Sequence, residues 1–124
     1  MKINEFIKKN LKVTNHSSGP LINHMLTSSR LPKIVCEDGF SMSVQVGYSL
    51  YSTPKKVAKR YSAVEIGFPS EPEELIKEYA ESLYDEDETD YTDTVYPYVP
   101  VAIVDKVLKK HGGINLTQTL LEAE

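Results

Sequence analysis

The stretch KIVCEDGFSMSVQVGYS, residues 33–49, carries the strongest fold signal in the chain. Two runs of β-forming residues flank Asp38-Gly39, and an Asp-Gly pair between such runs predicts a hairpin turn. In the second run apolar side chains alternate with small polar ones, which places them on opposite faces of a strand. We therefore expect a hairpin with one face in the core. The apolar positions are Phe40, Met42, Val44 and Val46, and the uncharged polar ones are Ser41, Ser43 and Gln45.

The segment before this hairpin has the spacing of helices. Apolar residues recur with a helical period over residues 3–12, with lysines on the other side, so we expect an amphipathic helix there. The turn-forming stretch NHSSGP, residues 15–20, ends it. Pro20 suits the first turn of a second, short helix, which Pro32 closes. The two helices would form an N-terminal helical hairpin.

The segment after the hairpin predicts a third strand, a connecting loop and two more helices. Residues 48–62 have no steady period and are expected to form a loop with four cations and three tyrosines, Tyr48, Tyr51 and Tyr61. Residues 63–68 read as a strand with Val64, Ile66 and Phe68 on one face. Ser70 is the expected N-cap of a helix over residues 71–83. Residues 94–100 look extended, and Gly112-Gly113 should end a helix that Pro100 opens.

Because strands follow helices rather than alternate with them, the expected fold is α+β. We predict a small antiparallel sheet with the N-terminal helical hairpin and two later helices packed on it. The 124 residues suffice for a single domain, residues 1–124. Residues 85–94 are expected to form an acidic, mobile loop, and residues 114–124 a C-terminal tail or docking segment.

Composition excludes several classes of protein. The one cysteine, Cys36, excludes an intrachain disulfide framework and a multi-cysteine zinc module, and favours a reducing compartment. A net charge of −4 argues against non-specific nucleic-acid binding. No apolar run is long enough to span a bilayer, and the N-terminus lacks a signal-peptide core. We expect a cytoplasmic protein without direct nucleic-acid or membrane partners.

The residues that could carry catalysis have simpler structural explanations. Ser17 and Ser18 adjoin His16, but no GxSxG motif is present and helix capping explains the same residues. Cys36 could pair with His16 or His24 as a thiolate, yet it lies in an apolar strand. The histidines lack zinc-ligand spacing, and helix-end electrostatics explain His111. We therefore predict no catalytic residue, metal or cofactor, and keep a small Cys/His enzyme as an alternative.

Two features favour an anionic, nucleotide-like ligand. HSSGP, residues 16–20, would place backbone N–H groups and serine hydroxyls at a helix start. PKKVAKR, residues 54–60, is a cationic loop whose neighbouring tyrosines could stack on a base. The uncharged strand face could lie between the two features. The predicted ligand-binding residues are His16, Ser17, Ser18, Arg30, Gln45, Tyr48 and Lys55.

Four stretches, NHSSGPLINHM (15–25), SSRLPKIVCEDGFSMSVQ (28–45), VEIGFPSEPEELI (64–76) and TVYPYVPVAIVDKVLKKHGGI (94–114), carry a resemblance over nearly the whole chain. The sequence resembles a family of small phage and prophage proteins of gut bacteria that has no assigned activity. The resemblance implies an accessory protein in a bacterial cytoplasm, and such proteins often counter host defence.

Three functional hypotheses follow. The first is a non-enzymatic protein that sequesters a nucleotide-like signal of a bacterial defence system, as a homo-oligomer if copies build the pocket between them. The second is an inhibitor that uses the acidic stretch 85–93 as a surface mimic to mask a host defence protein. The third is the small Cys/His enzyme.

Overall fold

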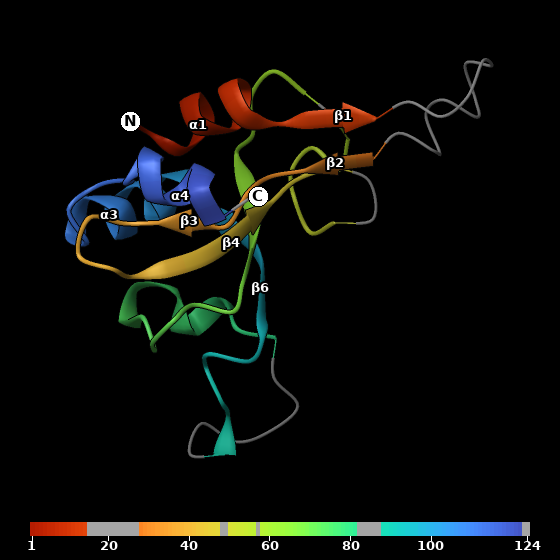
Figure 1. Cartoon of the computed structure of the whole chain (residues 1–124). Helices are drawn as coiled ribbons and strands as arrows, with labels where there is room; N and C mark the ends of the chain where they lie inside the picture. The colour runs from red at the N-terminus through yellow and green to blue at the C-terminus, as the bar shows by residue number, and fades with distance from the viewer. Residues whose placement is uncertain (15–27, 48–49, 57, 82–87, 123–124) are drawn as a thin grey trace.

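The hairpin predicted around Asp38-Gly39 is present in the computed structural model (Figure 1). The structure describes residues 1–14, 28–47, 50–56, 58–81 and 88–122. Strands β3 (Ile34–Val35) and β4 (Ser41–Gln45) pair antiparallel, with Val35 opposite Ser41. Gly39 has a φ of +95°, a conformation that glycine adopts without steric cost, and this explains the glycine in the turn.

The sheet is an antiparallel meander in the order β3-β4-β5-β6. Strand β5 (Ala63–Gly67) pairs with β4 and with β6 (Val95–Pro100). Strands β1 (Lys12–Thr14) and β2 (Ser28–Arg30) pair antiparallel and form a separate two-stranded ribbon. In Figure 1 this ribbon extends away from the helices. Of the expected second helix, residues 20–30, residues 20–27 lie outside the described residues, and Ser28–Arg30 form strand β2 rather than helix.

The inner face of the sheet forms the core with the helices. The helices are α1 (Ile3–Asn10), α3 (Val101–Lys110) and α4 (Leu116–Glu122), which lie close together in Figure 1. The predicted alternation over residues 40–46 is confirmed, since Phe40, Met42, Val44 and Val46 are all buried. The apolar faces of α1 and α3 cover these strands, and together they form one cluster of buried side chains that includes Phe6, Met42, Val44, Ile66, Tyr96, Val104 and Val107. The α+β class is therefore confirmed.

Two predictions near the end of β5 are wrong. Phe68 does not join Val64 and Ile66 in the core: its φ is +50°, which turns the chain, and its side chain is 48% exposed. Ser70 does not cap a helix, because its Oγ accepts the Ser41 N–H. The described helix is a short 3₁₀ helix, η1 (Glu74–Tyr79), and its N-cap is Glu73, whose carboxylate accepts the Leu75 N–H.

The C-terminal part of the chain docks on its own sheet. Gly112 and Gly113 end α3 with a Schellman pair of bonds, Gly113 N–H to Leu108 O and Gly112 N–H to Lys109 O, as the two glycines predict. Helix α4 packs on β3, where the buried Thr119 Oγ1 accepts the Val35 N–H at 2.9 Å. The sequence predicted a frayed tail or a segment docked on a partner for residues 114–124, whereas the described part packs on the chain's own sheet.

Candidate ligand-binding site

The candidate site lies on the outer face of the sheet, opposite the core. Gln45 on β4 is directly across from Glu65 on β5, and both side chains are half-buried. Neighbouring residues Val44 and Ile66 pair one step away and face the core. Because side chains alternate between faces, Gln45 and Glu65 share the outer face.

A bulge in β6 adds Tyr98 to this face. Two β6 residues, Pro97 and Tyr98, stand opposite Glu65, so that Tyr96 and Val99 can both face the core. Tyr98 has a φ of +53°, and its side chain is 42% exposed. For a residue with a Cβ this conformation costs about 1–2 kcal/mol. Such strain at an exposed aromatic residue is typical of functional positions.

Tyr51 completes an exposed pair of aromatic rings with Tyr98. The Tyr98 N–H donates to Tyr51 O at 3.1 Å, and the two ring centroids are 5.7 Å apart with planes tilted by 53°. Tyr51 N–H donates to Glu65 Oε1 at 3.4 Å, and the Lys55 ammonium lies 5.4 Å from the centre of the Tyr51 ring. We call Tyr51, Lys55, Glu65 and Tyr98 the tyrosine patch.

This patch contains chemical groups of the kinds that proteins commonly use to contact nucleotides. Exposed aromatic rings stack on a base, an ammonium group pairs with phosphate, and a carboxylate accepts hydrogen bonds from base N–H or ribose O–H groups. The segment that carries Tyr51 is held along β5, because Thr53 N–H donates to Ala63 O and Ser62 N–H donates to Thr53 O. The rings therefore sit on a hydrogen-bonded frame.

The predicted site residues are distributed as follows. Lys55 belongs to the tyrosine patch. Gln45 adjoins it through Glu65, but its amide is bonded to Leu31: Oε1 accepts the Leu31 N–H and Nε2 donates to Leu31 O. Arg30 pairs with Lys12 at the base of the β1–β2 ribbon, one residue before Leu31. His16, Ser17, Ser18 and Tyr48 lie outside the described residues.

Sequence reasoning missed Glu65 and Tyr98. The pattern YPYVP, residues 96–100, showed an extended segment but gave no sign of the bulge, because glycine is the residue expected at positive φ. Tyr61, one of the tyrosines counted in the cationic loop, is buried instead. Its hydroxyl donates to Lys56 O and accepts the Ala58 N–H, and burial raises its pKa.

A second cluster of titratable groups surrounds the buried His111. Its Nδ1 lies 2.6 Å from Asp38 Oδ2 and its Nε2 lies 2.7 Å from Glu73 Oε1, while the Phe40 ring stacks on it with centroids 4.0 Å apart. Lys110 Nζ is 2.9 Å from Glu73 Oε2. We call Asp38, Glu73, Lys110 and His111 the histidine cluster.

Electrostatics in the histidine cluster favour a charged imidazole. Burial alone would lower the pKa of His111, but its hydrogen bonds to Glu73 and Asp38 outweigh burial and raise it. Burial would raise the pKa of Glu73, but bonds from the Leu75 N–H, Lys110 and His111 leave it lowered. The Phe40 N–H and His111 lower the pKa of Asp38. Both ring nitrogens of His111 donate to carboxylates, so neither is free to act as a base. The position of His111 at the end of α3, from which the sequence analysis explained it, therefore accounts for only part of its interactions.

Cys36 lies close to this cluster and is nearly inaccessible, with 1% of its surface exposed. Burial, with the charges of Asp38 and Glu37, raises its pKa to about 11. The thiol is therefore protonated at neutral pH and is a poor nucleophile. Within the described ranges, no group of three or more His, Cys, Asp or Glu side chains is arranged to hold a metal ion.

No helix in the described part of the chain has the length and apolar character needed to cross a membrane. Comparison of the chain with the models of known protein families, with curated proteins and with solved structures finds no match.

Proposed function

We propose that the protein is a non-enzymatic binder of a nucleotide-like, anionic small molecule, and that the tyrosine patch holds the base. The observation that carries this proposal is the exposed Tyr51–Tyr98 pair, with Lys55 above one ring and a strained backbone at Tyr98. The positive φ of Tyr98 belongs to the bulge that keeps Tyr96 and Val99 in the core, and the Tyr98 ring lies beside Tyr51.

The charges around the rings support a phosphorylated ligand rather than a plain aromatic one. Lys55 is exposed and its ammonium lies over the Tyr51 ring, and Glu65 lies between the rings and Gln45. A base stacked on the tyrosines would bring its edge to the Glu65 carboxylate, which accepts hydrogen bonds only. The phosphate would then meet the Lys55 ammonium.

We further propose a biological setting for this binding. The protein acts in a bacterial cytoplasm as a phage accessory protein and counters host defence by removing a nucleotide signal. This setting rests on the resemblance to phage and prophage proteins. A homo-oligomer would enclose the ligand more fully, because the patch itself is a surface rather than a cavity.

The two alternative functions, masking and catalysis, would depend on other residues. A masking inhibitor would use its acidic segment, of which the described residues Glu88, Asp90 and Asp93 are exposed. Asp90 accepts hydrogen bonds from the N–H and Oγ1 of Thr92, which gives that end of the segment a defined turn. The enzyme alternative would be built around Cys36 or the histidines. The burial of Cys36 and the hydrogen bonds of His111 argue against these two residues, and His16 and His24 lie outside the described residues.

Calorimetric titration with AMP, adenosine and ribose 5-phosphate tests the proposal, because the three probes separate base from phosphate. We expect AMP to bind more tightly than either fragment. Tyr98→Leu should weaken AMP binding by about tenfold or more, which is the usual loss for one stacked base. Lys55→Gln should weaken binding of AMP and leave that of adenosine unchanged.

Two matched controls are available in the chain. Phe68→Leu removes another exposed aromatic ring at positive φ, and Lys56→Gln removes the neighbouring exposed lysine. Among the ring and cation–π interactions of the described residues, those of Tyr51 involve Tyr98 and Lys55 and neither of these two side chains. Equal losses in Phe68→Leu and Tyr98→Leu, or no AMP binding by the wild type, would contradict the proposal. A salt-sensitive complex with a bacterial protein, weakened by neutralising Glu88 and Asp90, would favour masking instead.

A further inference from the structure

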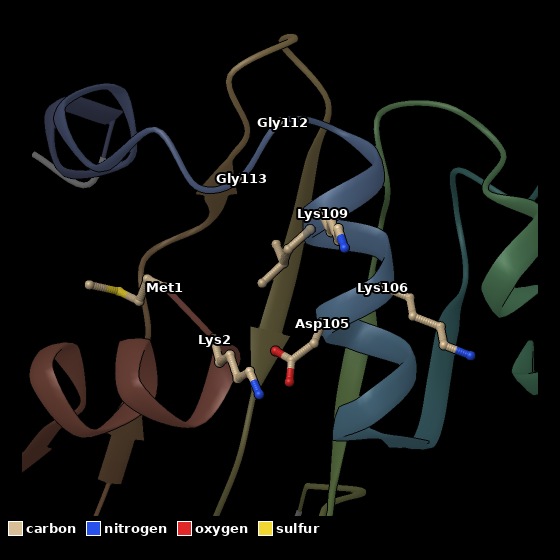
Figure 2. Close-up of a pocket in the computed structure, with 8 residues that line it drawn as sticks. Met1, Lys2, Asp105, Lys106, Lys109, Gly112 and Gly113 are labelled. Atoms are coloured by element: carbon tan, nitrogen blue, oxygen red, sulfur yellow. The ribbon is translucent and has the colours of Figure 1, made fainter.

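A pocket between the start of α1 and the second half of α3 offers a site unrelated to the tyrosine patch (Figure 2). Its volume is about 500 Å³, within the range of small-molecule sites. We propose that this pocket binds a small organic anion with an apolar body. The residues that line it are Met1, Lys2, Asp105, Lys106, Leu108, Lys109, Gly112 and Gly113.

The inner surface of the pocket is suited to an apolar group. Leu108 lines the pocket and is 2% exposed, and Gly112 and Gly113, which have no side chains, lie at its upper side in Figure 2. A Cβ built on Gly113 would meet no atom within 4 Å, so the space beside it is open. The helix-end carbonyls of Leu108 and Lys109 accept the Gly113 and Gly112 N–H groups, which reduces the polarity of this wall.

The charged groups of the pocket are mostly positive, although the whole chain carries −4. Lys2, Lys106 and Lys109 form no ion pair with any acidic side chain of the described segments. Asp105 is the one acidic lining residue, and its Oδ1 accepts the Ile3 N–H at 2.8 Å. A ligand anion would therefore meet lysines that lack an internal counter-ion.

Figure 2 separates the lysines by direction. Lys2 and Asp105 extend toward the same space from α1 and α3, whereas Lys106 extends away along the outer side of α3. Lys109 lies above Asp105, next to the glycine wall. We therefore assign Lys2 and Lys109 to the head group of the ligand, a carboxylate, sulfonate or phosphate, and Leu108 to its apolar body.

The dye 8-anilinonaphthalene-1-sulfonate has this combination of groups, and its uncharged analogue N-phenyl-1-naphthylamine lacks the anion. Fluorescence titration of the folded protein with both dyes tests the site. We expect one site for the anionic dye, and an affinity about fivefold or more lower in the Lys2→Gln/Lys109→Gln double variant, as for loss of charge-assisted contacts. The matched control is Lys8→Gln/Lys56→Gln, which changes the net charge equally at two exposed lysines outside the pocket.

A third variant tests the location of the site. Gly113→Asn would place a side chain in the open space, and asparagine tolerates the φ of +91° better than most residues. We expect it to weaken binding of both dyes while circular dichroism and the unfolding midpoint show a folded protein. The proposal is overturned if the pocket double variant binds the anionic dye as tightly as its control, or if the neutral dye binds the wild type equally well.

Discussion

His111 should contribute more to the free energy of unfolding than any exposed polar residue, because its removal leaves charges without partners. In His111→Leu the Glu73 carboxylate, 1% exposed, keeps Lys110 but loses its bond to the imidazole. Breaking a buried ion pair by removing one partner costs about 3–5 kcal/mol. The stacked contact with Phe40 adds to the loss. Urea unfolding at neutral pH, followed by circular dichroism, measures the difference.

The pH dependence gives this prediction a second readout. The folded-state pKa of His111 is raised above its ordinary value of 6.5, so its stabilisation is complete below that value and is lost as pH rises through the folded-state pKa. The wild type should therefore lose stability as the pH rises above about 6.5, and His111→Leu should show a flatter profile over the same range. The carboxylates of Asp38 and Glu73, whose pKa values are lowered, stabilise the fold at neutral pH. This stabilisation is lost as the pH falls through their folded-state pKa values, so they affect the pH profile only on its acid side.

A double-mutant cycle identifies the cause of the loss. Glu73→Gln keeps an oxygen that can accept the Leu75 N–H but removes the buried charge. Since this charge is what His111→Leu leaves without its partner, the double variant should recover about 1–3 kcal/mol relative to the sum of the single changes. Strictly additive losses, or a His111→Leu variant as stable as the wild type at neutral pH, would refute the reasoning.

Three further predictions concern the backbone and the strained residues. Gly112→Ala should lower the free energy of unfolding by about 1–2 kcal/mol, because φ is +89° and the new Cβ would lie 3.1 Å from Glu37 Cβ; a loss below that of Gly113→Ala in urea unfolding would contradict this. Thr119→Val should cost about 1–3 kcal/mol, because the buried Val35 N–H loses its acceptor, and an unchanged midpoint in thermal unfolding would argue against the docking of α4. Tyr98→Gly should raise the midpoint or leave it unchanged by relieving the positive φ, while abolishing AMP binding; a strongly destabilised variant would mean that the tyrosine serves the fold.

Elements with a regular period could be predicted from the sequence. The hairpin at Asp38-Gly39, strand β5, and helices α1 and α3 all place apolar residues at two- or 3.6-residue intervals, because one face of each is buried. The glycine cap of α3 could also be predicted, because Gly112 and Gly113 adopt the positive φ that ends a helix and glycine is the residue that does so most readily.

The candidate sites could be predicted only in part, because they depend on tertiary contacts. Lys55 was named from its cationic loop, but Tyr98 and Glu65 join it only through the register of β5 and β6 and an unmarked bulge. Asp38 and Glu73 are 73 and 38 residues from His111 in sequence, and no local pattern connects them. Glu73 lies within the helix expected over residues 71–83, whereas in the structure it caps η1 and is buried beside the imidazole.

Backbone amide NMR during titration with AMP tests the central claim most directly. We predict saturable shifts that cluster at Tyr51, Lys55, Glu65 and Tyr98, with little change at Lys2 and Lys109 in the α1–α3 pocket. Shifts confined to that pocket, or no saturable shift in any assigned amide, would contradict the claim that the outer sheet face binds a nucleotide.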